Sequence, residues 1–163
     1  MIDSLAQGKG AIPKIKNLSA RRITLNLPEP VVLGQYVIRS RGFAVITVEL
    51  EDGSKGQSFG LDRGTPVADV VNTLIAEPYK EIFDGDPINT FDAILRRMSA
   101  LLSSGASLRG LSLVDIATHD AVARHKGTTV VESFGKKDKE HPMWGVVGYP
   151  PSRGPEDIAW EVE

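Results

Sequence analysis

The sequence of 163 residues contains no cysteine, which excludes disulfides, thiolate nucleophiles and cysteine-based zinc or iron–sulfur sites. It also lacks a large excess of positively or negatively charged residues. The formal net charge is -2, so nothing in the composition favours nucleic acid or an anionic membrane as a partner. No apolar run approaches the ~20 residues that cross a bilayer, and the first ten residues lack the apolar core of a signal peptide. These absences favour a cytoplasmic enzyme.

The composition that remains is that of an ordinary globular chain. Hydrophobic residues make up 41% and charged residues 25% of the sequence, which is enough apolar material for a sizeable core. The length suits one domain and the start of another. We expect residues 1–14 to be a mobile tail, because they carry no periodic apolar pattern.

The first half of the chain predicts three strands. Apolar and polar residues alternate from Ile15 to Leu27, and we expect Pro28 and Pro30 to end this strand because proline cannot donate to a ladder. Residues 28–42 then form a loop-like insert. A second strand, 43–51, places on one face a set of alternate apolar residues: Ala44, Ile46, Val48 and Leu50. Asp52-Gly53 predicts a hairpin turn into a third strand, 57–61.

Three helices are predicted to follow. The first has Thr65 as N-cap and Pro66 in its first turn, and Glu77-Pro78 is expected to disrupt it. The second is capped by Asn89 or Thr90 and has apolar residues at helical spacing as far as Leu102.

The third predicted helix has Ser112 as N-cap and Gly127 as its stop. Its small residues Ala117, Ala121 and Ala123 suit close packing against another element.

After Gly127 the pattern changes. Trp144 to Tyr149 predicts a short buried strand, and Pro155 to Glu163 predicts the beginning of a helix. The fold class is therefore α+β: a three-stranded antiparallel meander, then a three-helix bundle, then one βα unit. We assign residues 15–140 to the first domain and residues 141–163 to the start of a second domain.

Several stretches of the sequence resemble one protein family. They are Gly56-Gln57-Ser58-Phe59 before Thr65-Pro66, the turn Phe83 to Pro87, the helical segment Leu113 to Asp120, and Gly148-Tyr149-Pro150 before Pro155. In this order they resemble the N-terminal capping domain of the enolase superfamily, in its mandelate racemase/muconate lactonizing enzyme group. The resemblance covers the chain from about Ile15 onward. It identifies the last segment as the start of a truncated (β/α) barrel.

The resemblance implies a chemistry that this chain does not contain. Family members bind Mg²⁺ with carboxylates from three barrel strands and remove the proton α to a substrate carboxylate. Those strands are missing here, so no catalytic or metal-binding residue is carried over. The implied partners are a barrel domain or barrel chain, a carboxylate-bearing substrate and further copies of the same chain.

The resemblance also implies that two loops of the cap select the substrate. They correspond to residues 28–42 and 60–64, with Tyr149 at the end of the first barrel strand. The candidates to face substrate are Tyr36, Arg39, Arg41, Asp62, Arg63 and Tyr149. An arginine fork can bond both oxygens of a carboxylate. The competing interpretation is that these are ordinary solvated loop residues, or packing in the case of Tyr149.

The histidine and aspartate residues of the third predicted helix are better explained as packing residues and ion-pair partners than as a metal site or an acid/base pair. His119 and His125 are six residues apart on one predicted helix, so they lie on different faces and do not share a metal. Asp115 and Asp120 are expected to pair with Arg124 and Lys126. Two further functions stay open: a stand-alone oligomerisation or interaction module, and an unrelated small-ligand α+β domain.

Overall fold

We describe the protein from a computed structural model, which covers residues 10–100, 104–135 and 156. The order of elements is β1 (Ile15–Leu33), β2 (Tyr36–Leu50), β3 (Lys55–Leu61), α1 (Val67–Val70), a π-helical turn η1 (Val71–Ile75), α2 (Ala76–Ile82), α3 (Pro87–Arg97), α4 (Gly105–Lys126) and α5 (Val130–Ser133). The sheet has the order β1-β2-β3, and β2 pairs with β3 in antiparallel register. The predicted α+β class is confirmed.

The chain divides into two compact units, residues 1–23 with 43–137 and residues 24–42 with 138–163. The first unit contains the helices and one continuous hydrophobic core. The described part of the second unit is mainly a β-hairpin, in which β1 and β2 are joined by a tight turn at Gly34, whose φ is 59°. The predicted strand at 144–149 and the rest of the predicted βα unit, apart from Glu156, lie outside the described residues.

The prediction that prolines end the first strand is wrong, and so is the prediction of a loop over residues 28–42. β1 continues through Pro28 and Pro30 to Leu33. These prolines are two residues apart in an edge strand, so both nitrogens face the same side of the strand. When that side faces away from β2, the missing N–H groups cost the ladder nothing.

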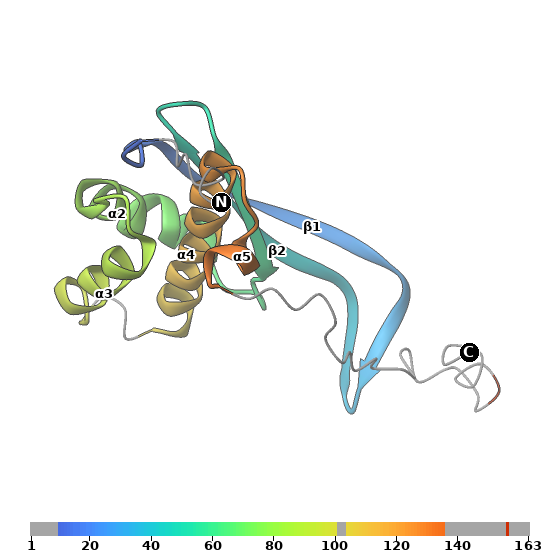
Figure 1. The fold of residues 1–163 in the computed structure, drawn as a ribbon. Helices are drawn as coiled ribbons and strands as arrows, with labels where there is room; N and C mark the ends of the chain where they lie inside the picture. The colour runs from blue at the N-terminus through green and yellow to red at the C-terminus, as the bar shows by residue number, and fades with distance from the viewer. Residues whose placement is uncertain (1–9, 101–103, 136–155, 157–163) are drawn as a thin grey trace. The chain divides into compact units, whose positions relative to one another are not determined.

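The core lies between the sheet and the helices. The alternate residues Ala44, Ile46, Val48 and Leu50 are at most 1% exposed, as their spacing predicts. Figure 1 shows α4 between the strands and the helices α2 and α3. The contact between α4 and β3 is very close, because a Cβ on Gly56 would lie 2.0 Å from the carbonyl oxygen of Ala117. The face of α4 that carries Ala117 and Ala121, predicted from the sequence to pack closely, therefore packs against β3.

The N-cap of helix α4 lies eight residues before the predicted N-cap Ser112. The observed N-cap is Ser104, whose Oγ accepts a hydrogen bond from the Ser107 N–H at 3.2 Å, while the Ser112 hydroxyl donates to the Arg109 carbonyl within the helix. Gly110 lies inside α4. A Cβ there would lie 3.0 Å from the Val71 side chain, so the glycine lets α4 approach η1 closely. The stop at Gly127 is confirmed, with φ of 69°.

The other helices differ from prediction mainly at their ends. Helix α3 is capped by Asp86, not by Asn89 or Thr90, and the Asp86 carboxylate accepts from the Ile88 N–H at 2.9 Å. Pro78 does not interrupt the first helical segment, which continues to Ile82. The π-helical turn η1 comes immediately before α2, and such wide turns accommodate local departures from the α-helical ladder.

The side chain of Asn72 on η1 joins the helical layer to the edge of the sheet. Its amide donates to the Ala20 carbonyl at 2.9 Å, and its oxygen accepts from the Ala20 N–H at 2.9 Å. Both main-chain groups of this β1 residue are therefore satisfied by a side chain and not by a neighbouring strand.

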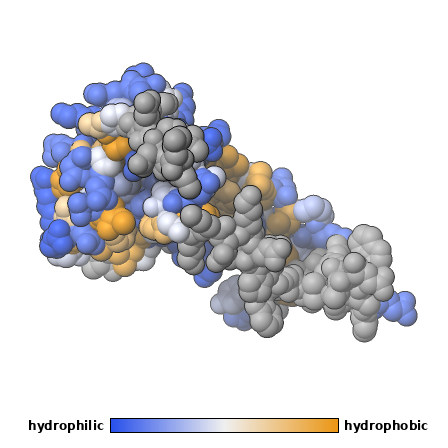
Figure 2. Space-filling view, viewed as in Figure 1, coloured by the Kyte–Doolittle hydropathy of each residue, from blue (hydrophilic) through white to orange (hydrophobic). Residues whose placement is uncertain are grey.

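Apolar side chains are also exposed. Phe59 on β3 is 72% exposed and meets Phe43 of β2 edge to face, with ring centroids 6.3 Å apart. On the face drawn in Figure 2, hydrophobic residues lie in several separate places among hydrophilic ones. No helix in residues 10–100 and 104–135 combines the length and apolar character needed to cross a membrane.

Candidate functional site

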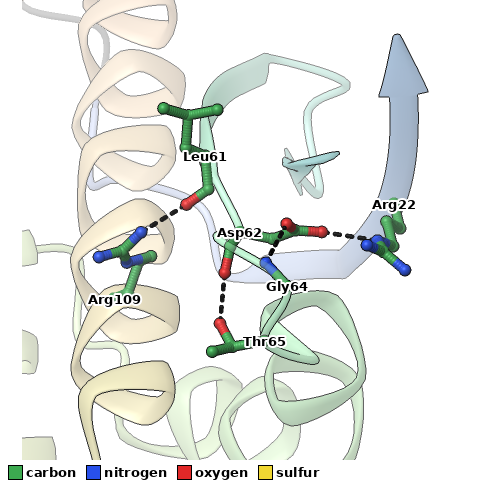
Figure 3. Close-up of polar contacts among 6 residues, drawn as sticks. All are labelled: Arg22, Leu61, Asp62, Gly64, Thr65 and Arg109. Atoms are coloured by element: carbon green, nitrogen blue, oxygen red, sulfur yellow. Dashed lines mark hydrogen bonds and ion pairs between the residues drawn. The ribbon is translucent and has the colours of Figure 1, made fainter. Parts of the chain in front are cut away.

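The loop from Leu61 to Thr65 connects β3 to α1 and contains two of the predicted site residues. It is held by a network centred on Asp62 (Figure 3). The Asp62 carboxylate accepts from the Gly64 N–H at 2.9 Å, and the Asp62 carbonyl accepts from the Thr65 N–H at 2.9 Å and from its hydroxyl at 2.5 Å. An Asp side chain bonded to the main chain two residues onward is a common way to close a tight turn.

Two arginines from distant parts of the chain bind this loop. The Arg22 Nε donates to the second carboxylate oxygen of Asp62 at 2.6 Å, and the Arg109 guanidinium donates to the Leu61 carbonyl at 2.6 Å (Figure 3). Arg22 lies on β1 and Arg109 on α4, so the loop is attached both to the sheet and to the helical layer.

The Asp62 side chain is only 2% exposed. Burial by itself would raise the pKa of this carboxyl, but the Gly64 N–H, the Arg22 guanidinium and the charge of Arg109 outweigh burial and hold the pKa below its usual value. Asp62 therefore stays ionised, and within the chain its two oxygens bind Gly64 and Arg22.

Arg63 follows Asp62 with a backbone that side chains rarely adopt. Its φ is 50°, and Gly64 after it has φ of 76°. A left-handed residue other than glycine costs about 1–2 kcal/mol, so the bonds around Asp62 must hold it. Arg63 is exposed, and its guanidinium has no hydrogen bond or ion pair to any described residue. The loop thus presents an unpaired cation on a fixed backbone.

The hairpin carries three other predicted residues. Tyr36, the first residue of β2, is 66% exposed; Arg39 is exposed and Arg41 is partly buried. They lie on a strand and not on the predicted loop. Tyr149 lies outside the described residues. The substrate-facing role of all six candidates stays a prediction.

Sequence reasoning missed Arg22 and Arg109 as supports of the loop. Each appears locally as a polar residue in a strand or helix. Their contacts join positions 40 and 48 residues apart, so no short motif marks them. The Asp-Arg-Gly triplet itself was the available signal, since Asp and Gly are typical turn residues.

A second polar contact joins α4 to the turn between β2 and β3. The Nδ1 atom of His125, whose side chain is 7% exposed, lies 2.6 Å from Asp52 Oδ2. This bond, with the Ser54 N–H, lowers the pKa of Asp52 to about 2. It fixes the end of α4 against the turn, as expected for a structural histidine.

We expect His125→Gln to raise the pKa of Asp52 from about 2 toward the ordinary value of about 3.9, because the main contact that stabilises the carboxylate is lost. The Ser54 N–H remains, so the return should be incomplete. The measurement is a carboxyl-carbon titration followed by NMR. An unchanged Asp52 titration would show that this contact is absent in solution.

The other histidine of α4 has different partners. His119 Nε2 lies 3.7 Å from Asp115 Oδ1, and its ring meets Phe134 with centroids 5.0 Å apart. Asp115 therefore lies beside His119 and not beside Arg124 or Lys126 as predicted, while the Asp120–Arg124 pair is confirmed at 3.0 Å. His119 and His125 have separate partners. Across the described residues, no three His, Asp or Glu side chains gather as a metal site.

Comparisons with known proteins give fold-level matches only. No family model and no curated protein matches the sequence. Solved structures do match. An enolase from Bradyrhizobium, complexed with magnesium and mandelic acid, is 22% identical with a TM-score of 0.65, over 78% of this chain and 36% of that one. An enolase superfamily member from a Polaromonas species is 20% identical with a TM-score of 0.69, over 91% and 40%.

The chain shares the fold of part of these enolase-superfamily structures. A mandelate racemase/muconate lactonizing enzyme-like protein from Rubrobacter xylanophilus also matches, at 18% identity and a TM-score of 0.63. This chain spans 33–40% of the length of these three proteins. The likeness to enolase-superfamily proteins predicted from the sequence is therefore confirmed at the level of fold, and the matched region is a minor part of each of these solved chains.

Proposed function

We propose that this chain is the capping, substrate-selecting part of a cytoplasmic mandelate racemase-like enzyme. The reaction would be Mg²⁺-dependent removal of the proton α to a carboxylate, leading to racemisation or dehydration of an acid or acid-sugar substrate. The observation that carries the proposal is the enolase-superfamily fold, matched over 78% of this chain but 36% of the Bradyrhizobium protein. A cap of this size leaves the chemistry to a barrel domain.

Magnesium does not fit the described residues. No three of their acidic or histidine side chains gather as a metal site, and several carboxylates already bind cations: Asp62 binds Arg22, Asp120 binds Arg124, and Glu49 binds Lys16 and Lys55. Two of the neighbours are described as magnesium-bound. We place the metal, as well as the catalytic acid and base groups, in a barrel that this chain joins.

The cap would contribute binding energy and selectivity. Arg63 on its fixed loop offers a planar fork to a substrate carboxylate. Tyr36, Arg39 and Arg41 belong to the separate hairpin unit, and that unit would offer contacts of its own. Such contacts also exclude water from the reacting centre once a barrel mouth is covered. Assembly would involve the barrel domain and further copies of the complete enzyme.

The first test is the mass of the protein in its native source, by intact mass spectrometry after affinity capture. We expect a mass well above 17.6 kDa. The second is α-proton exchange in D₂O with Mg²⁺ and a panel of hydroxy acids and acid sugars. The longer protein should exchange a substrate proton, and the 163-residue chain should not. Exchange by the 163-residue chain alone would refute the proposal, as would a native mass of 17.6 kDa without a barrel partner.

A further inference from the structure

Arg22 is an exposed side chain with a strong contact to Asp62. Its side chain is 58% exposed, yet its Nε lies 2.6 Å from an Asp62 carboxylate that is 2% exposed. A charge-assisted bond of this length is stronger than a neutral one. The neighbouring Arg21 is also exposed on β1, and no hydrogen bond or ion pair joins it to a described residue.

The contacts of the loop leave it little freedom. Arg22 and the Gly64 N–H bind the Asp62 carboxylate, Thr65 binds the Asp62 carbonyl, and Arg109 binds the Leu61 carbonyl (Figure 3). These contacts are made by residues both before and after Arg63 in the sequence. They do not use the guanidinium of Arg63 itself, which stays exposed.

We propose that Arg22 is a positioning residue, which through Asp62 holds the 61–65 loop in one conformation before any ligand arrives and so presents Arg63 ready for a carboxylate. The fixed loop is a property of this chain alone, and only the identity of the ligand rests on the proposed function. A preformed cation loses less conformational entropy on binding than one that must first be ordered.

Trypsin cleavage after Arg63 reports directly on this loop. A protease binds its substrate as an extended segment, and the left-handed backbone at Arg63 and Gly64 is not extended. Cleavage there requires the loop to open, so its rate follows the opening equilibrium when reclosing is fast. Peptide masses identify each cleaved bond, and cleavage after Arg97 and Arg124 in the same digest reports on opening elsewhere.

Four forms of the 163-residue chain make the comparison: wild type, Arg22→Gln, Arg22→Lys and the matched control Arg21→Gln. Arg22→Gln removes the charged contact, whereas Arg22→Lys keeps the charge at Asp62. We expect Arg22→Gln to accelerate cleavage after Arg63 by about tenfold relative to the other two sites, the effect of one charged hydrogen bond. Arg21→Gln should resemble wild type, and Arg22→Lys should restore most of the protection.

Two outcomes overturn the proposal. One is equal cleavage after Arg63 in Arg22→Gln and Arg21→Gln, which would show that Arg22 does not hold the loop. The other is equal acceleration at all three sites, which would show a general loss of stability. Urea unfolding of each variant, followed by circular dichroism, distinguishes that case. Neither outcome depends on finding a substrate, so this test fails independently of the α-proton exchange test.

Discussion

Gly56→Ala should destabilise the protein more than any other small substitution in the sheet, by about 3 kcal/mol or more. A Cβ at this position would lie 2.0 Å from the Ala117 carbonyl oxygen and 2.2 Å from the Ala121 nitrogen. Both are main-chain atoms of α4, so no side-chain rotation relieves the clash. Either the strand and helix separate or the variant fails to fold. Urea unfolding monitored by circular dichroism measures the difference in the free energy of unfolding.

Two other glycines provide matched controls. Gly105, the first residue of α4, has no atom within 4 Å of a Cβ, so Gly105→Ala should be neutral or stabilise by up to about 1 kcal/mol. Gly60 would place its Cβ 3.1 Å from a Leu113 methyl carbon, which can shift, so Gly60→Ala should be intermediate. Equal unfolding midpoints for Gly56→Ala and Gly105→Ala would contradict the close β3–α4 packing.

Asp62→Asn should cost about 2 kcal/mol at pH 7, because it removes the charge that Arg22 binds while keeping an oxygen for the Gly64 N–H. The cost should depend on pH. The pKa of Asp62 is lowered in the folded protein, so its contribution is fully present above about pH 4 and is lost as the pH falls through the folded pKa. The difference between wild type and variant should therefore shrink in acid.

The measurement is the free energy of unfolding in urea at pH 7, 5 and 3 for both proteins. Asp92→Asn serves as control, because Asp92 is an exposed carboxylate on α3 with no hydrogen bond or ion pair to a described residue. That variant should match wild type at all three pH values. If the loss in Asp62→Asn stayed constant from pH 7 to pH 3, the ionised carboxylate would not be the source of the stabilisation.

The sequence predicted those features that depend on neighbouring residues. Strict alternation placed Ala44, Ile46, Val48 and Leu50 on one buried face, and Gly127 ended α4 where expected. Both follow from local geometry: the period of two in a strand, and the left-handed residue that closes a helix.

The features that were missed depend on tertiary structure. Pro28 and Pro30 would end a strand only if their nitrogens faced a neighbouring strand that needs an N–H donor. The sequence does not show which side of the strand has a neighbour. Nor does the sequence show that Gly110 lies where a Cβ would meet the Val71 side chain at 3.0 Å. The same limit applies to the site: the Asp62-Arg63-Gly64 turn was visible, whereas Arg22 and Arg109 became its supports only through folding.

The bidentate contact between Asn72 and Ala20 has a consequence for self-association. An edge strand is a template on which another chain can add a strand, and β1 is an edge strand of this sheet. At Ala20 the carboxamide of Asn72 already occupies both the N–H and the carbonyl that such a strand would need. An incoming segment must displace it before continuous pairing along β1 can begin, so this edge carries its own barrier to strand addition and fibril-like stacking.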